Sequence, residues 1–112
     1  MQTETLDQAN NLLISLIETF SISRNESGTA ELLCKFFKKH NIDAQRIENN
    51  VIVRSKKFDT SKPTILLNSH HDTVKPGDGW NSDPFNAICD NGKIIGLGSN
   101  DAGASLVSLI FT

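Results

Sequence analysis

The stretch that decides the fold is Thr64-Ile65-Leu66-Leu67-Asn68-Ser69-His70-His71-Asp72, which occupies residues 64–72 and follows a proline. Its first half has an unbroken apolar centre, which is typical of a strand buried on both faces in an α/β sheet. Its second half places His70 and Asp72 directly after the apolar residues. The pattern therefore predicts a buried strand over residues 64–68 with polar, reactive side chains at its carboxyl end, where ligands bind in open α/β sheets.

Two amphipathic helices are predicted upstream of this strand. Apolar residues recur at spacings of three and four over residues 6–20 and again over residues 30–37, which is the period of a helix with one buried face. The second helix is expected to end near His40, because basic side chains in its last turn suit the carboxyl end of the helix dipole. Asn41, which tolerates the left-handed conformation, would then stop the helix.

A hairpin is predicted between the second helix and the buried strand. Two β-prone runs, residues 42–47 and residues 51–54, flank Glu48, Asn49 and Asn50. Asparagine accepts positive φ in a tight turn, so the turn is expected at these residues.

The second half of the chain is predicted to contain a long loop, a short strand and the start of a third helix. Turn-forming residues predominate over residues 70–88, where Trp80 and Phe85 are expected to pack the loop down. A strand at residues 93–95 and an apolar helical segment at residues 106–111 follow. Because that last segment has no cap and no polar tail, we expect the chain to be the front part of a longer protein.

Composition limits the possible partners. A chain of 112 residues is one domain or less. Eleven basic against thirteen acidic residues give a formal charge of -2, so neither nucleic acid nor a membrane surface is an expected partner. We find no apolar run that could span a membrane and no signal peptide, and we expect a cytoplasmic protein. Cys34 and Cys89 have no Cys-x-x-Cys spacing, which favours reduced thiols.

Three residues stand out as candidates for chemistry: His70, Asp72 and Asp101. In an extended backbone, side chains two positions apart point the same way, so His70 and Asp72 can act together while His71 faces the opposite side. A metal-bound imidazole usually donates its second N–H to a carboxylate, as Asp72 could accept here. Asp101 lies 31 residues after His70 and could bring an oxygen ligand to the same place. The plainer alternative, a loop histidine hydrogen-bonded to its neighbour, stays open.

These residues belong to a longer string of motifs that resembles the zinc-dependent aminoacylase and carboxypeptidase family. The string consists of residues 66–76 (Leu-Leu-Asn-Ser-His-His-Asp-Thr-Val-Lys-Pro), Gly79-Trp80, Asp83-Pro84-Phe85, Gly92-Lys93 and Gly96-Leu97-Gly98-Ser99-Asn100-Asp101. The resemblance covers nearly all 112 residues, and it is greatest to the acetylornithine deacetylase subgroup. It implies an α/β three-layer sandwich fragment with a mixed β-sheet, in which residues 1–112 are the N-terminal portion of a zinc hydrolase catalytic domain without its lid domain and C-terminal half.

The resemblance also implies roles for individual residues. His70 resembles a zinc ligand, and Asp101 resembles the carboxylate that bridges two zinc ions. Asp72 resembles the aspartate that orients the histidine ligand and is counted among the catalytic residues. Two zinc ions per complete site are implied, with cobalt as a possible substitute, and two of the family's usual five ligand residues are present. The family's cis peptide bond is expected between Asp101 and Ala102.

The implied activity is removal of the acyl group from N-acyl-L-ornithine, a small-molecule substrate, in arginine biosynthesis. The family's general base is a glutamate of a Glu-Glu pair, and no such pair occurs in these 112 residues, so the chain alone is expected to be inactive. The complete protein is expected to be a homodimer. Two departures from the family's common pattern, Ala102-Gly103-Ala104-Ser105 after the bridging aspartate and the late position of Pro76, suit the ornithine subgroup.

Other functions remain open at this point. A succinyl-diaminopimelate desuccinylase or a metallodipeptidase of the same family shares these opening motifs. A non-catalytic binding module could also keep the fold without the chemistry. The choice between acetyl and succinyl groups, the remaining zinc ligands and the oligomeric state are not encoded in these motifs.

Overall fold

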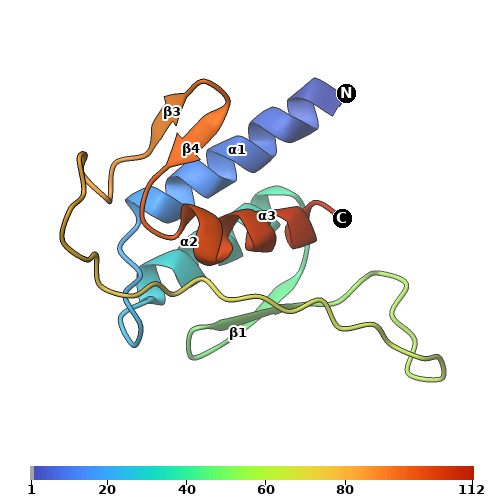
Figure 1. Ribbon diagram of the computed structural model, residues 1–112. Helices are drawn as coiled ribbons and strands as arrows, with labels where there is room; N and C mark the ends of the chain where they lie inside the picture. Colours follow the sequence, from blue (N-terminus) through green and yellow to red (C-terminus); the bar gives the residue numbers. More distant parts are fainter. Residues whose placement is uncertain (1) are drawn as a thin grey trace.

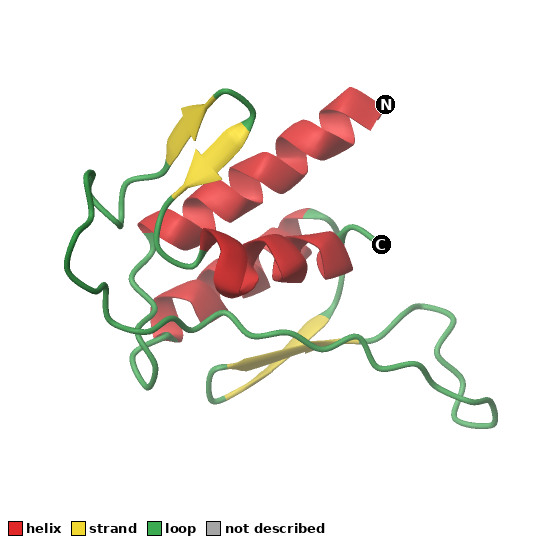
Figure 2. Ribbon diagram, viewed as in Figure 1, coloured by secondary structure: helices red, strands yellow, loops and turns green. Residues whose placement is uncertain are grey.

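The computed structural model describes residues 2–112, and its helices and hairpins follow one another along the chain (Figure 1). The elements are α1 (Gln2–Glu18), α2 (Ser27–Lys39), β1 (Ala44–Ile47), β2 (Asn50–Val53), β3 (Ile88–Asp90), β4 (Lys93–Ile95), the short π-type turn η1 (Ser99–Gly103) and α3 (Ala104–Ile110). Figure 2 shows that one long connection without regular structure joins the two hairpins. None of the helices in residues 2–112 is long and apolar enough to cross a membrane.

The core lies where the three helices meet. Its buried side chains come from α1, α2 and α3: Leu12, Leu13, Leu16, Ile17, Leu33, Phe37 and Val107. Burial of each such side chain stabilises the fold by about 1.5–3 kcal/mol. The apolar stripe predicted for the first helix is confirmed in its middle, but Leu6 is 59% exposed and Phe20 is 51% exposed. Leu6 lies in the amino-terminal half of α1, which projects beyond the other helices (Figure 1), and Phe20 lies beyond the last helical residue.

The second and third helices agree with the sequence patterns. Helix α2 begins at Ser27 and ends at Lys39, and Asn41 has the expected left-handed φ of 57°. Its inner face includes Thr29 and Ala30, both fully buried. The third helix is present from Ala104 to Ile110.

Each of the two hairpins is an antiparallel pair. Strands β1 and β2 pair with Ala44 opposite Val53, as predicted, although the turn residue with positive φ is Glu48 and not an asparagine. Strand β4 has the predicted bounds, but its partner β3 was not predicted; it begins at Ile88, the last residue of the predicted loop.

The predicted buried strand over residues 64–68 is wrong for this structure. The segment carries no strand assignment, and Ile65 is 87% and Leu66 82% exposed. A strand buried on both faces needs partners on its edges and cover on its faces, and no other strand within residues 2–112 pairs with this segment. The mixed sheet expected from the family resemblance is therefore not formed here. Residues 2–112 combine helices with two small antiparallel sheets.

The long loop is anchored at one of the two predicted aromatic residues. Phe85 is half-buried, and its ring centroid lies 5.9 Å from that of Phe20. Trp80, by contrast, is 39% exposed, so the prediction that it packs the loop down is wrong. The Phe20–Phe85 contact joins the end of α1 to the loop that leads to β3.

Candidate functional site

The loop between α1 and α2 binds the segment of residues 70–73, which contains the candidate residues His70 and Asp72. Thr73 donates its backbone N–H to the carbonyl of Ser21 at 2.8 Å, and its own carbonyl accepts the N–H of Ser23 at 2.9 Å. These two bonds form a parallel bridge between Ile22 and Thr73. Residues 70–72 therefore have a fixed place beside the helices, whereas residues 64–68 are exposed.

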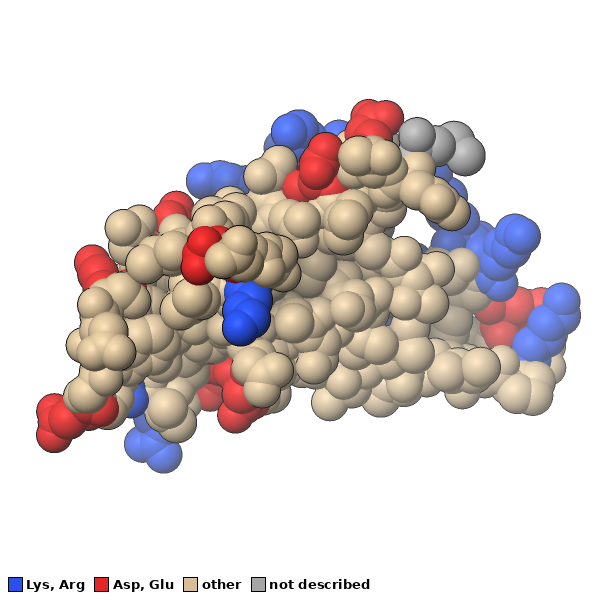
Figure 3. All heavy atoms as spheres, turned by 45° about the horizontal axis from the view of Figure 1, so that its top comes forward, with Lys and Arg blue, Asp and Glu red and all other residues tan. Residues whose placement is uncertain are grey.

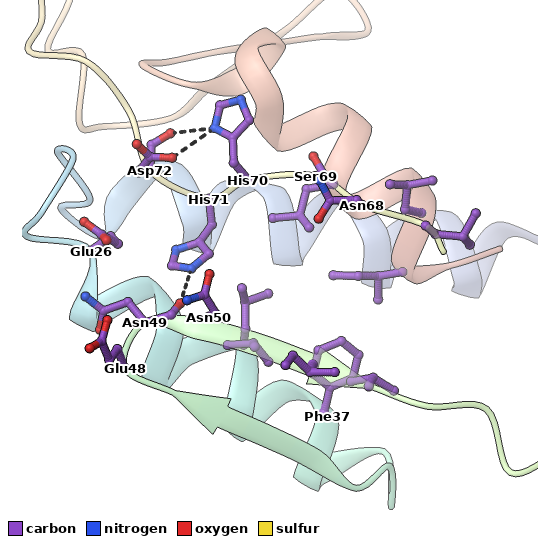
Figure 4. Close-up of a pocket in the computed structure, with 18 of the residues that line it drawn as sticks. Glu26, Phe37, Glu48, Asn49, Asn50, Asn68, Ser69, His70, His71 and Asp72 are labelled. Atoms are coloured by element: carbon purple, nitrogen blue, oxygen red, sulfur yellow. Dashed lines mark hydrogen bonds and ion pairs between the residues drawn. The ribbon is translucent and has the colours of Figure 1, made fainter. Parts of the chain in front are cut away.

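His70 lies between two carboxylates. Its Nδ1 is 3.1 Å from Asp72 Oδ1, and its Nε2 is 3.1 Å from Asp101 Oδ1. Figure 4 shows the imidazole of His70 and the side chain of Asp72 facing each other along the extended segment. The structure thus brings together the three residues that the sequence singled out, with Asp101 arriving from η1.

A tight turn delivers Asp101 to His70. Gly98 has a φ of 79°, a conformation that favours glycine, and its carbonyl accepts the N–H of Gly103 at 2.8 Å. A Cβ on Gly103 would lie 2.6 Å from that carbonyl oxygen and 2.7 Å from Leu13 Cδ1, so this position admits only hydrogen. The expected cis peptide bond between Asp101 and Ala102 is present.

The charges around His70 favour its protonated form. Partial burial acts to lower the pKa of His70, but the carbonyl and carboxylate of Asp72 and the charge of Asp101 outweigh it and raise the pKa above 6.5. Carboxylate oxygens only accept hydrogen bonds, so an imidazolium can donate to both of them. The hydroxyl of Ser23 lowers the pKa of Asp72 most; partial burial opposes that effect and His70 adds to it.

Ser23 contacts Asp72 in the candidate site, and sequence patterns do not predict this contact. Its Oγ donates to Asp72 Oδ2 at 2.5 Å, while Oδ1 of the same carboxylate faces His70. Ser23 lies 49 residues before Asp72, in a polar turn between helices, and no spacing rule links the two positions.

His71 points to the other side of the segment, as expected from the alternation of an extended chain. Its Nε2 lies 2.8 Å from the carbonyl of Asn49, and its Nδ1 lies 2.7 Å from Thr29 Oγ1. The carbonyl only accepts, so Nε2 of His71 carries a proton. The ring ties the turn of the first hairpin to α2 and is half-buried.

A cavity of about 650 Å³ opens beside the site. Its polar end, shown in Figure 4, is lined by Glu26, Glu48, Asn49 and Asn50 near His71. Its other end is apolar and is lined by side chains of α2, β2 and α3. One carboxylate oxygen of Glu26 is buried without a hydrogen-bond partner among residues 2–112. Nothing in the sequence pattern predicts this cavity.

The residues present fit part of a zinc site. Two ligands of one tetrahedral zinc ion lie about 3.4 Å apart when each bond is about 2.1 Å long, and Nε2 of His70 and Oδ1 of Asp101 are 3.1 Å apart. Imidazole nitrogen and carboxylate oxygen are both zinc ligands. Within the described residues, however, no group of three or more His, Cys, Asp or Glu side chains could hold a metal ion. His70 and Asp101 are therefore suited to be two ligands of a larger set.

Comparison with known proteins places the chain near hydrolases. No protein-family model matches it. It is 24% identical over 103 residues to a succinyl-diaminopimelate desuccinylase of Sulfurovum sp. (strain NBC37-1), covering 89% of this chain and 27% of that protein. It is 29% identical over 108 residues to a protein of the same name from Coxiella burnetii (strain Dugway 5J108-111), covering 94% of this chain and 29% of that protein.

A third relative is more similar over a shorter stretch. The chain is 40% identical over 78 residues to an uncharacterized metallohydrolase of Methanococcus maripaludis, covering 67% of this chain and 18% of that protein. The chain thus spans less than a third of the length of these curated relatives. The names of these three relatives support a hydrolase, and the name of the Methanococcus protein specifies a metal-dependent hydrolase.

Proposed function

We propose that this chain is the N-terminal part of the catalytic domain of a zinc-dependent hydrolase of the aminoacylase and carboxypeptidase family. The observation that carries the proposal is the arrangement of His70 between Asp101 and Asp72, with 3.1 Å from each ring nitrogen to a carboxylate oxygen. The names of the three relatives support the same class. In the complete domain, the exposed segment over residues 64–68 would be a strand of the mixed sheet.

His70 and Asp101 would hold the metal through Nε2 and a carboxylate oxygen. Zinc held there would polarise an acyl carbonyl and lower the pKa of a water molecule, so that hydroxide would be available as a nucleophile near neutral pH. Asp72 would accept the N–H of Nδ1, which fixes the tautomer in which Nε2 is free to bind. Asp72 Oδ2 is held at the same time by Ser23. The ring therefore has one orientation before any ligand arrives.

The proposed substrate is a small N-acyl amino acid whose acyl group is removed in the cytoplasm. Two substrates have separate support. N-acyl-L-ornithine follows from the motif resemblance, and N-succinyl-diaminopimelate follows from the names of two relatives. Both are linear amides that differ at the far end of the amino acid, and N-acetylornithine differs also in the acid released.

The test is a substrate panel on the complete protein that carries residues 1–112. Release of free amine from N-acetylornithine, N-succinylornithine, N-succinyl-diaminopimelate and a dipeptide is measured with added zinc or cobalt. Activity on one or more of them, lost in His70→Ala and in Asp101→Ala, supports the proposal. Activity that both variants retain would refute it. The 112-residue chain alone is expected to release no amine above a metal-only control.

A further inference from the structure

Ser23 is placed to control the orientation of the candidate ligand without touching it. Its Oγ donates to Asp72 Oδ2 at 2.5 Å, and Asp72 Oδ1 is 3.1 Å from Nδ1 of His70. Each oxygen of the carboxylate therefore has its own partner. A carboxylate fixed at both oxygens cannot rotate about its terminal bond without breaking one of these contacts. The three side chains form a line that ends at Nε2 of His70.

The hydroxyl of Ser23 is not needed to attach the loop. The backbone of Ser23 and Ser21 already binds the backbone of Thr73 through two hydrogen bonds of 2.9 and 2.8 Å, and Ser21 is buried. The hydroxyl has one other acceptor, the carbonyl of Thr73, but at the longer distance of 3.3 Å. Removing the hydroxyl would leave the backbone bridge in place and free only the carboxylate of Asp72.

We propose that Ser23 is a positioning residue that acts through Asp72 to hold the imidazole of His70 with Nε2 free for a metal ion. The proposal rests on the function proposed above, because it concerns the same candidate site. A hydrogen bond to an ionised acceptor is shorter and stronger than a neutral one, which suits a residue that must fix a carboxylate at a half-exposed site. Partners of this kind behind a metal ligand typically contribute 10–100-fold to metal affinity.

The test compares Ser23→Ala with wild type and with two matched variants of the same chain. Ser23→Thr keeps the hydroxyl. Ser27→Ala removes a hydroxyl from the first residue of α2, and within residues 2–112 this side chain makes no hydrogen bond. If Ser23→Ala does not fold, Ser23→Cys replaces it, since a thiol is only a weak donor. Folding is checked by far-UV circular dichroism and by the backbone amide spectrum.

The first measurement needs no metal. Long-range nitrogen–proton NMR spectra of the histidine rings, recorded where His70 is neutral, report which ring nitrogen carries the proton. We expect His70 to carry it on Nδ1 in wild type, in Ser23→Thr and in Ser27→Ala. In Ser23→Ala we expect a smaller Nδ1–H fraction that is not abolished, because the carbonyl of Asp72, 3.2 Å from Nδ1, still accepts. An unchanged tautomer in Ser23→Ala, or an equal change in Ser27→Ala, would overturn the proposal.

The second measurement is the zinc dissociation constant of the complete protein that carries residues 1–112, determined by competition with a chromophoric chelator. We expect roughly tenfold weaker binding in Ser23→Ala, at the low end of the range for residues behind a ligand, and no such loss in the two matched variants. In an Asp72→Ala background the same substitution should have no further effect, and a full effect there would show that Ser23 does not act through Asp72. If wild type binds zinc no better than His70→Ala, the proposed function fails, and the NMR result still decides the role of Ser23.

Discussion

Replacing Gly103 by alanine should unfold the turn that brings Asp101 to His70. Gly103 is buried in η1 with helical φ and ψ of -54° and -49°, so the backbone conformation itself suits alanine. The obstacle is space, because the added Cβ would lie 2.6 Å from the carbonyl oxygen of Gly98 and 2.7 Å from Leu13 Cδ1. Leu13 can adjust its side chain, but the Gly98 oxygen belongs to the backbone of the same turn and accepts the N–H of Gly103.

The expected cost follows from this overlap. Overpacking of one methyl group in a tight site costs about 1–3 kcal/mol, which is a large part of the ~5–15 kcal/mol that stabilises a typical domain. With a urea m value of about 1.5 kcal/mol/M for a small protein, the midpoint of unfolding should fall by about 0.7–2 M. The shift is measured by circular dichroism in urea.

Gly77→Ala is the matched control. A Cβ on Gly77 would meet nothing within 4 Å, and its φ is not positive. The same substitution there should leave stability unchanged or raise it by about 0.4–1 kcal/mol through the unfolded state. The reasoning is refuted if Gly103→Ala unfolds at the same urea concentration as wild type, or if the two glycine variants behave alike.

Three further predictions concern the site and the core. Zinc affinity should rise with pH through the raised pKa of His70, because the proton on Nε2 competes with the metal; calorimetric affinities that stay constant from pH 5 to 8 would contradict this. Asp72→Asn should weaken zinc binding by about 10–100-fold, and any stability it costs at neutral pH should disappear below pH 3.8 as the lowered native pKa of Asp72 is passed, which urea titrations at several pH values would show. Leu33→Ala, at a residue 3% exposed, should cost about 2–5 kcal/mol, whereas Leu66→Ala, at a residue 82% exposed, should change stability by less than about 0.5 kcal/mol; equal losses in urea unfolding would refute the assigned core.

The sequence patterns predict local structure well where that structure depends only on residues close together in the chain. The helical spacing of apolar residues predicts the buried middle of α1. The left-handed conformation of Asn41 after α2 follows from the preference of asparagine itself. The same holds for the opposite directions of His70 and His71, which follow from the alternation of an extended chain.

The patterns fail where burial or a contact depends on a segment that is distant in the sequence. The apolar run at residues 64–68 has the composition of a central strand, but burial depends on partners, and none pairs with it within residues 2–112. Leu6 fits the apolar stripe of α1 and is exposed because no helix reaches it. The role of Ser23 depends on a contact across 49 residues, and such contacts have no periodic signature.

Surface charge adds little to the site. On the face shown in Figure 3, most basic and acidic side chains lie toward the rim, some of each sign lie nearer the middle, and neither sign gathers into one patch. The formal charge of -2 leaves no strong overall field to concentrate an anionic substrate.

The most direct measurement is an anomalous difference map at the zinc edge from a crystal of the complete protein that carries residues 1–112, grown with zinc. We expect a peak about 2.0–2.2 Å from both Nε2 of His70 and a carboxylate oxygen of Asp101, with Asp72 still on Nδ1. A map with no peak at this pair, or with zinc bound elsewhere while the two side chains lie apart, would contradict the assignment of His70 and Asp101 as ligands of a shared metal.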